Sequence, residues 1–166
     1  LGISLKNISE ALETFKSVPG RLEFIGTTNG IKIYNDTTST TPEAGIAALE
    51  SFKNKKSKII LICGGSDKGL NMDKFVDKAI KNTRKIILLS GSGTEKIKPR
   101  LTGCPIFISL TSAIKTAFKY AKKGDLILFI PAFASFGMFK NYIDRGNQFK
   151  KEVKKMCYLC NHNLQN

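Results

Sequence analysis

The fold of this chain is indicated most clearly by residues 129–149, which read FIPAFASFGMFKNYIDRGNQF. An apolar segment that starts at Leu126 stops at Pro131, small and polar residues follow, and apolar side chains then recur at helical spacing. This pattern predicts a buried strand, a loop and a helix. In an open α/β sheet, ligands bind at such junctions, beyond the carboxyl ends of the strands.

Length and composition favour one domain. The chain has 166 residues, of which 42% are hydrophobic, and this is enough for one sizeable core. We therefore predict a single domain over residues 1–166, with a leading helix within residues 1–17 and a polar tail at 154–166 that we expect to fray. Because the chain begins at Leu1 without a methionine and soon enters a helical pattern, we expect it to be part of a longer protein.

The sequence has no membrane or secretion signal. No apolar run approaches the roughly 20 residues of a membrane span, and the first residues lack the apolar core of a signal peptide. We expect a cytoplasmic protein. The formal net charge of +14 would suit a polyanion, but the lysines are spread over element ends and helix exteriors. This distribution favours a solvated surface over a nucleic-acid groove, and such a surface would also attract small anions.

The four cysteines do not form a metal-site pattern. Cys157 and Cys160 make one C-x-x-C pair with His162 close behind, whereas structural zinc sites usually draw their ligands from two such pairs. We therefore expect reduced, structural thiols and no metal site.

Strand and helix signals alternate along the chain. Two runs of β-forming residues, 22–27 and 31–34, flank an Asn-Gly pair that predicts a hairpin. Helical patterns then alternate with apolar runs at 58–63, 85–89, 106–109 and 126–130. We predict an α/β fold, namely a doubly wound, mostly parallel Rossmann-like sheet that opens with a β-hairpin and carries helices on both faces.

Two helix starts carry recognisable signals. Thr41 is predicted to cap a helix whose first residue is Pro42. Asp73 is predicted to cap the next helix, in which Ile80 is expected to face the core.

Polar loops follow three of the predicted strands, and a parallel order would bring them to one edge of the sheet. A lysine there supplies charge, hydroxyls supply hydrogen bonds, and aromatic rings supply an apolar wall, so the set suits a carboxylate or phosphate ligand. The residues concerned are Lys68, Thr40, Ser135, Phe136 and Tyr142. Taken alone, the hydroxyl-rich loop is as typical of a helix cap as of an anion site, and the glycine turn at 64–69 is more typical of a plain turn.

The sequence offers no catalytic group. The phosphate-loop pattern G-x-x-x-x-G-K-[ST] is absent, and the single histidine, His162, lies in the tail, which argues against a Ser-His-Asp mechanism. We therefore predict a binding half-site with no catalytic residue.

Four motifs together resemble the C-terminal domain of the Mur ligases. They are VPGRLE at 18–23, NDTTST at 35–40, GGSDKG at 64–69, and PAFASFGMFKNY at 131–142 with Arg145, Gly146 and Phe149 behind it. The resemblance covers nearly the whole chain, and it is strongest to the branch that adds D-glutamate.

The resemblance implies an ATP-dependent ligase of peptidoglycan synthesis. In the family, ATP, with Mg²⁺ as its cofactor, phosphorylates the carboxylate of UDP-N-acetylmuramoyl-L-alanine, and the amine of D-glutamate attacks the acyl phosphate. The C-terminal domain closes over the other two and presents the amino acid. Matched position by position, the family's D-glutamate-binding residues are Lys68, Ser135, Phe136, Thr40 and Tyr142. The residues that reach the nucleotide are Arg21 and Asp36.

Two positions depart from the family pattern: Thr38 stands where a lysine is common, and Gly20 where a histidine is common. Because the phosphate loop and the UDP-sugar domain are absent, we predict that the isolated chain is an inactive monomer that binds no cofactor fully. Two alternatives remain open at this point. One is a Mur-type domain that adds a different amino acid, and the other is a basic module that binds a nucleotide or nucleic acid.

Overall fold

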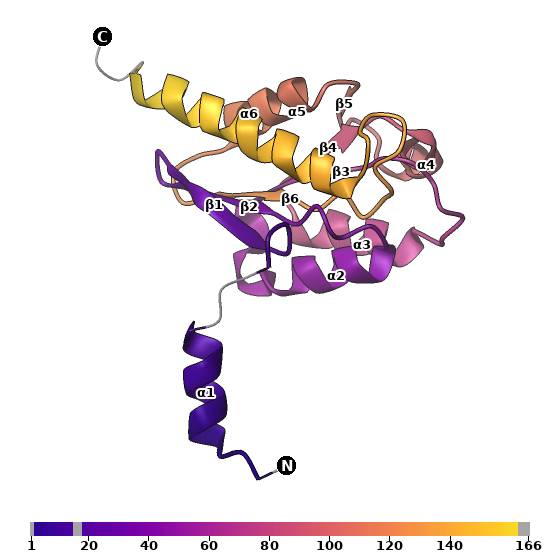
Figure 1. Cartoon of the computed structure of the whole chain (residues 1–166). Coiled ribbons are helices and arrows are strands. Elements are labelled where there is room, and N and C mark those ends of the chain that lie inside the picture. Colours follow the sequence, from indigo (N-terminus) through magenta and orange to yellow (C-terminus); the bar gives the residue numbers. More distant parts are fainter. Residues whose placement is uncertain (1, 15–17, 163–166) are drawn as a thin grey trace.

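The computed structural model describes residues 2–14 and 18–162. In chain order, the elements are α1 (Leu5–Thr14), β1 (Glu23–Thr28), β2 (Ile31–Asn35), α2 (Pro42–Glu50), η1 (Lys53–Lys58), β3 (Ile59–Cys63), α3 (Asp73–Asn82), β4 (Lys85–Leu89), α4 (Ser92–Ile97), η2 (Lys98–Arg100), β5 (Ile106–Phe107), α5 (Leu110–Tyr120), β6 (Leu126–Phe129) and α6 (Tyr142–His162). Figure 1 shows α1 apart from the sheet and its covering helices.

The predicted sheet is confirmed. Six strands lie in the order β1-β2-β6-β3-β4-β5; β1 and β2 are antiparallel, and the other neighbouring pairs are parallel. The hairpin turns at Asn29 and Gly30, whose φ angles of 51° and 75° are the left-handed values that a tight turn requires. Strand β6, which was predicted at 126–130, lies between β2 and β3 at the centre of the sheet.

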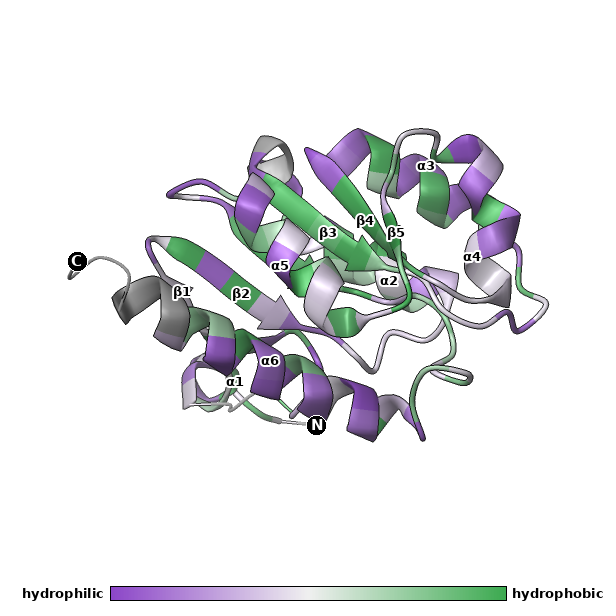
Figure 2. Ribbon diagram, turned by 90° about the horizontal axis from the view of Figure 1, so that it is seen from above, coloured by the Kyte–Doolittle hydropathy of each residue, from purple (hydrophilic) through white to green (hydrophobic). Residues whose placement is uncertain are grey.

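Helices cover both faces, as predicted. Side chains of α2 and α3 pack on one face of the sheet, and side chains of α5 and α6 pack on the other (Figure 1). Every residue of β3 and β6 is buried, because each of these strands lies between two helical layers. Figure 2 shows the contrast between the hydrophobic central strands and the hydrophilic outer surface of α6.

The long helix α6 is anchored to the central strand by an aromatic pair. The rings of Phe149 and Phe129 stack with their centroids 4.4 Å apart, and both side chains are fully buried. The loop at 130–141 is thus held between β6 and α6.

The helix starts were only partly predictable. Thr41 caps α2 by accepting a hydrogen bond from the Ala44 amide, and Pro42 is the first helical residue, as expected. Asp73 is itself the first residue of α3, and its carboxylate accepts from Arg100 at 2.9 Å instead of capping the helix. Ile80 is 51% exposed, so its predicted inward orientation was wrong.

Two further boundaries differ from expectation. The strand predicted at 106–109 stops at Phe107, and Ile108 is 86% exposed because the chain there leaves the sheet for the start of α5. The tail expected to fray from residue 154 continues α6 as far as His162, while residues 163–166 lie outside the described part. Within the described residues, no helix has the length and apolar character that a bilayer crossing requires.

Candidate functional site

Two of the predicted polar loops are joined at the carboxyl edge of the sheet. The Ser66 amide donates to the Ala134 carbonyl at 3.0 Å, and the Ala134 amide donates back to the Ser66 carbonyl at 3.2 Å. The Ser66 hydroxyl also donates to the carbonyl of Phe136. The loop after β3, which carries Lys68, and the loop after β6, which carries Ser135, therefore form one structural unit.

Lys68 brings in the third loop. Its ammonium nitrogen lies 3.4 Å from the Thr40 carbonyl oxygen and 3.5 Å from Thr40 Oγ1, at the outer limit of hydrogen bonding. Lys68 and Thr40 line one small hollow together with Ser66, Asp67 and Phe133. The structure thus brings the predicted lysine and one predicted hydroxyl together on a platform that includes the Ser135 loop.

The neighbouring carboxylate, Asp67, is already neutralised. It forms an ion pair with Lys96 and accepts a hydrogen bond from the Gly69 amide at 3.0 Å. These interactions, with the Lys96 hydrogen bond the largest, hold the pKa of Asp67 below its ordinary value. Among the described residues, no carboxylate forms an ion pair with Lys68. The exposed ammonium of Lys68 is therefore free to attract an anionic ligand.

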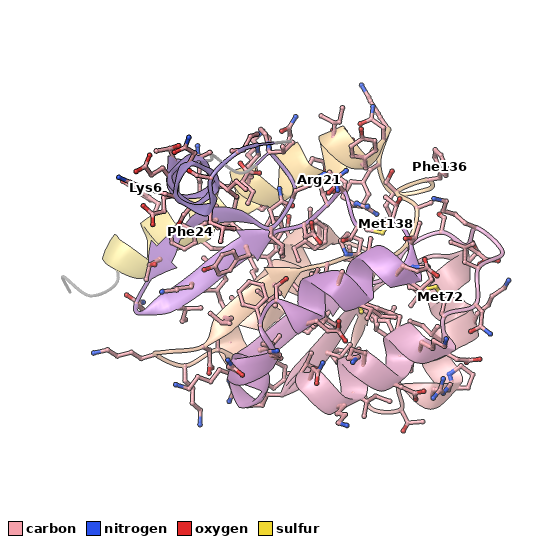
Figure 3. All side chains as sticks on the ribbon, turned by 90° about the horizontal axis from the view of Figure 1, so that it is seen from below. Lys6, Arg21, Phe24, Met72, Phe136 and Met138 are labelled. Atoms are coloured by element: carbon pink, nitrogen blue, oxygen red, sulfur yellow. The ribbon has the colours of Figure 1, made fainter. Side chains whose placement is uncertain are left out.

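The two predicted aromatic residues lie in different places. Phe136 is 67% exposed and projects from the loop after β6 (Figure 3), directly after Ser135, which is buried. Tyr142 is 45% exposed and lines a separate hollow with Gly20, Thr37 and other residues. Phe136 therefore belongs to the platform of Lys68 and Ser135, whereas the Tyr142 ring lies beside the loop that follows β2.

The two residues assigned to the nucleotide share a pocket. Arg21, which is exposed, and Asp36 line a depression of about 270 Å³ along one side of α2. The Asp36 carboxylate is buried and accepts hydrogen bonds from the Leu22 amide at 3.0 Å and from the Ser39 hydroxyl. Asp36 therefore shapes its own loop, and Arg21 is the member of the pair with an exposed charge (Figure 3).

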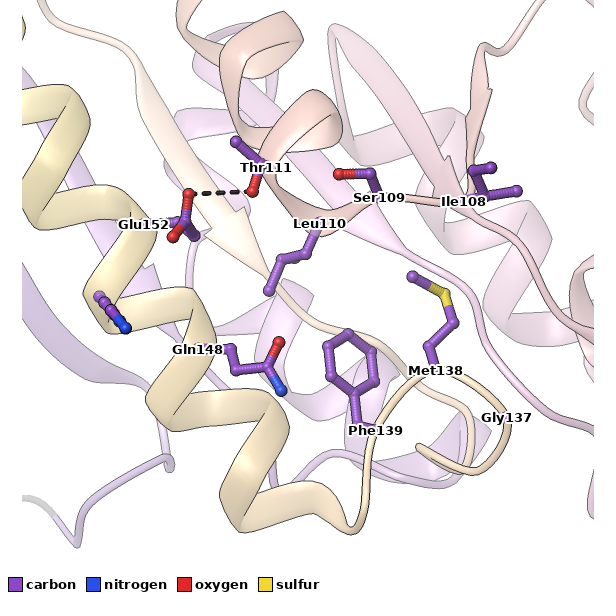
Figure 4. Close-up of a pocket in the computed structure, with 10 residues that line it drawn as sticks. Ile108, Ser109, Leu110, Thr111, Gly137, Met138, Phe139, Gln148 and Glu152 are labelled. Carbon is purple, nitrogen blue, oxygen red and sulfur yellow. Dashed lines mark hydrogen bonds between the residues drawn. The ribbon is translucent and has the colours of Figure 1, made fainter.

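A larger pocket, of about 660 Å³, lies between the 137–139 turn, the start of α5 and one face of α6 (Figure 4). Leu110, Met138 and Phe139 form part of its wall, and the Thr111 hydroxyl donates to Glu152 at 2.9 Å across one end. None of the seven predicted site residues lines it.

The structure adds one residue whose role the sequence did not indicate. Arg145 is 1% exposed and donates hydrogen bonds to both the 36–41 loop and the 131–136 loop. A signal was present, because Arg145 lies four residues before Phe149 and eight before Val153, which is the spacing of one helical face, and all three side chains are buried.

The described cysteines are free thiols. Burial raises the pKa of Cys63 above the ordinary range, and it also raises the pKa of Cys104. Cys157 is also free, while the side chains of Cys160 and His162 lie outside the described part. Over the residues that the structure describes, no three His, Cys, Asp or Glu side chains gather as a metal site would require.

A comparison with known protein families gives the class to which this fold and its polar edge belong. Residues 20–133 match the family described as "Mur ligase, glutamate ligase domain", and the chain therefore belongs to that family.

Similar proteins of known name narrow the family to one of its branches. The chain is 43% identical over 159 residues to a protein of Caldanaerobacter subterraneus, covering 92% of this chain and 34% of the relative. A protein of Borreliella burgdorferi is 41% identical, covering 94% of this chain and 35% of the relative. A protein of Aquifex aeolicus is 39% identical, covering 93% of this chain and 37% of the relative. All three are named UDP-N-acetylmuramoylalanine–D-glutamate ligase. The chain spans about a third of the length of these relatives.

Solved structures share the fold. The MurF ligase of Thermotoga maritima in complex with ADP superposes with a TM-score of 0.59 at 22% identity, covering 86% of this chain and 33% of that one. The murein peptide ligase of Psychrobacter arcticus superposes with a TM-score of 0.59 at 19% identity, covering 96% of this chain and 33% of that one.

Proposed function

We propose that this chain is the D-glutamate-binding domain of an ATP-dependent ligase that joins D-glutamate to UDP-N-acetylmuramoyl-L-alanine in peptidoglycan synthesis. The observation that carries the proposal is the position of Lys68. Its exposed ammonium has no carboxylate partner among the described residues, and it lies 3.5 Å from Thr40 Oγ1 beside the Ser135 loop. The names of the three relatives favour D-glutamate over another amino acid.

The proposed site would hold the amino acid by its carboxylates. Lys68 supplies the charge, and the hydroxyls of Thr40 and Ser135 supply directional hydrogen bonds, which together suit a dicarboxylate. Phe136 would cover the methylene groups of the ligand. Tyr142, whose ring lines a separate hollow, would act through its carbonyl, which accepts a hydrogen bond from the Thr37 hydroxyl three residues before Thr40. Holding the ligand by these groups leaves its amine free to attack an activated carboxyl group, and such orientation is a large part of catalysis by proximity.

The nucleotide would be contacted at a second place on the same edge. The exposed guanidinium of Arg21 suits a phosphate group, and Asp36 supports the loop beneath it through its bonds to Leu22 and Ser39. ATP supplies the phosphoryl group that activates the acceptor carboxyl. Since the chain spans about a third of its relatives and has no phosphate-loop motif, we assign Mg²⁺ and the UDP-sugar to other parts of the ligase. We further propose that the ligase is a cytoplasmic monomer and that this chain alone is inactive.

The proposal is tested by a titration of the isotope-labelled chain with D-glutamate, followed through its backbone amide resonances. We expect the largest shifts at Thr40, Lys68 and Ser135, on three segments that meet only in the fold. L-Glutamate at the same concentration is the control, and it should shift these amides less. Shifts confined to other parts of the chain, or equal responses to both enantiomers, would exclude this edge as a D-glutamate site.

A further inference from the structure

The guanidinium group of Arg145 lies buried beneath the two loops that carry the proposed D-glutamate site. Its Nε donates to Thr37 Oγ1 at 3.1 Å, one terminal nitrogen donates to the Thr37 carbonyl at 2.9 Å, and the other donates to the Phe133 carbonyl at 3.0 Å. The residue is 1% exposed. All three acceptors are neutral oxygens.

This cation has no counter-ion in the described part of the chain. None of the ion pairs formed there includes Arg145. Burial lowers the pKa of its guanidinium to about 10, so the group still carries its charge at neutral pH. A buried charge held only by neutral acceptors is costly to keep, and it makes the surrounding space favourable for an anion.

The hydrogen bonds of Arg145 join three segments that carry predicted site residues. Thr37, which accepts twice from Arg145, lies three residues before Thr40 and donates its own hydroxyl to the Tyr142 carbonyl at 2.8 Å. Phe133 lies two residues before Ser135. One side chain therefore fixes the loop after β2, the loop after β6 and the first turn of α6 relative to one another.

We propose that Arg145 is a positioning residue of the D-glutamate site. Its forked guanidinium sets the separation between the Thr40 and Ser135 hydroxyls, and its uncompensated charge adds to the attraction that Lys68 exerts on a dicarboxylate. This inference rests on the function proposed above, and it concerns how the site is held together and not which ligand it takes.

Arg145→Lys in the full-length ligase is the informative variant, because lysine keeps the charge but cannot span the Thr37 and Phe133 acceptors at once. We expect the Michaelis constant for D-glutamate to rise about tenfold, since small displacements of binding groups have effects of that size or larger. The Michaelis constant for the UDP-sugar substrate should not change, and kcat should fall less than the D-glutamate constant rises. Thr37→Val removes the hydroxyl that accepts from Arg145 and donates to the Tyr142 carbonyl but keeps the Thr37 carbonyl, so it should shift the same constant in the same direction by less.

Arg84→Lys is the matched control. Arg84 also contacts a carbonyl, that of Tyr120, and pairs with Asp125 at the opposite, amino edge of the sheet. This variant should lower the melting temperature without changing the Michaelis constant for D-glutamate. If Arg145→Lys and Thr37→Val behave like Arg84→Lys while Lys68→Ala still raises that constant, the positioning role is refuted and the proposed function stands. If Lys68→Ala has no effect either, both are refuted.

Discussion

At the scale of single residues, the ammonium group of Lys68 has no carboxylate partner in the described part of the chain, because the neighbouring carboxylate, that of Asp67, pairs with another lysine. Asp67 directly precedes Lys68, yet its carboxylate pairs with Lys96, whose ammonium comes from α4. Asp67, like an ordinary aspartate, is ionised at neutral pH, and the hydrogen bond from Lys96 lowers its pKa further. Without Lys96, an unpaired anion would lie beside Lys68 and compete with a carboxylate ligand for it.

Lys96→Met is therefore expected to weaken D-glutamate binding although Lys96 is not a predicted ligand contact. We expect the Michaelis constant for D-glutamate in the full-length ligase to rise by up to about fivefold, the effect of a nearby charge at an exposed site. The measurement is steady-state kinetics at low ionic strength. Adding Asp67→Asn should restore the constant toward the wild-type value, and an effect that the second substitution leaves in place would contradict this electrostatic account.

At the scale of elements, the site depends on how closely α6 approaches the loop after β2. Gly146 permits this approach, because a Cβ atom at that position would lie 2.6 Å from Thr37 Cγ2 and 3.2 Å from Thr37 Cβ. Thr37 cannot move aside freely, since it is buried and bonded to both Arg145 and Tyr142. The glycine in the first turns of α6 is thus required by packing.

Gly146→Ala should destabilise the chain, against the expectation from helix propensity. Propensity alone would stabilise α6 by about 1 kcal/mol. We expect the clash with Thr37 to outweigh this gain, with a net loss of about 1–3 kcal/mol in the free energy of unfolding, as for overpacked cores. Urea unfolding of the chain measures the difference.

Asn147→Ala, at the exposed neighbouring position of α6, is the control for this experiment. Its effect should stay within about 0.5 kcal/mol. A Gly146→Ala variant that is more stable than the wild type would show that α6 can move away from Thr37, and that the close approach is not needed.

At the scale of the whole molecule, the sequence predicted the sheet because its central strands are continuous apolar runs with turn signals at their ends. It also predicted a shared polar edge, since the carboxyl ends of parallel strands meet there. Lys68, Thr40 and the Ser135 loop do meet at that edge. These features are local patterns or direct consequences of parallel order.

Other features depend on contacts between distant segments and could not be predicted from local patterns. Ile80 has the spacing of a core residue, but the packing of α3 leaves it half exposed, and Ile108 lies where the chain has already left the sheet. Thr37, which accepts hydrogen bonds from Arg145, lies more than 100 residues before it in the sequence. The separation of Tyr142 from the Lys68 hollow likewise follows from how α6 docks.

The chain spans about a third of its relatives, so its proposed role is best measured in the full-length ligase. The central claim is that the ammonium of Lys68 holds D-glutamate, and the most direct test is the Michaelis constant for D-glutamate of Lys68→Ala beside that of Lys119→Ala, an exposed lysine near the end of α5. Loss of a hydrogen bond to a charged group predicts a rise of at least about tenfold for Lys68→Ala, with no change for Lys119→Ala. Equal constants for the two variants and the wild type would contradict the account.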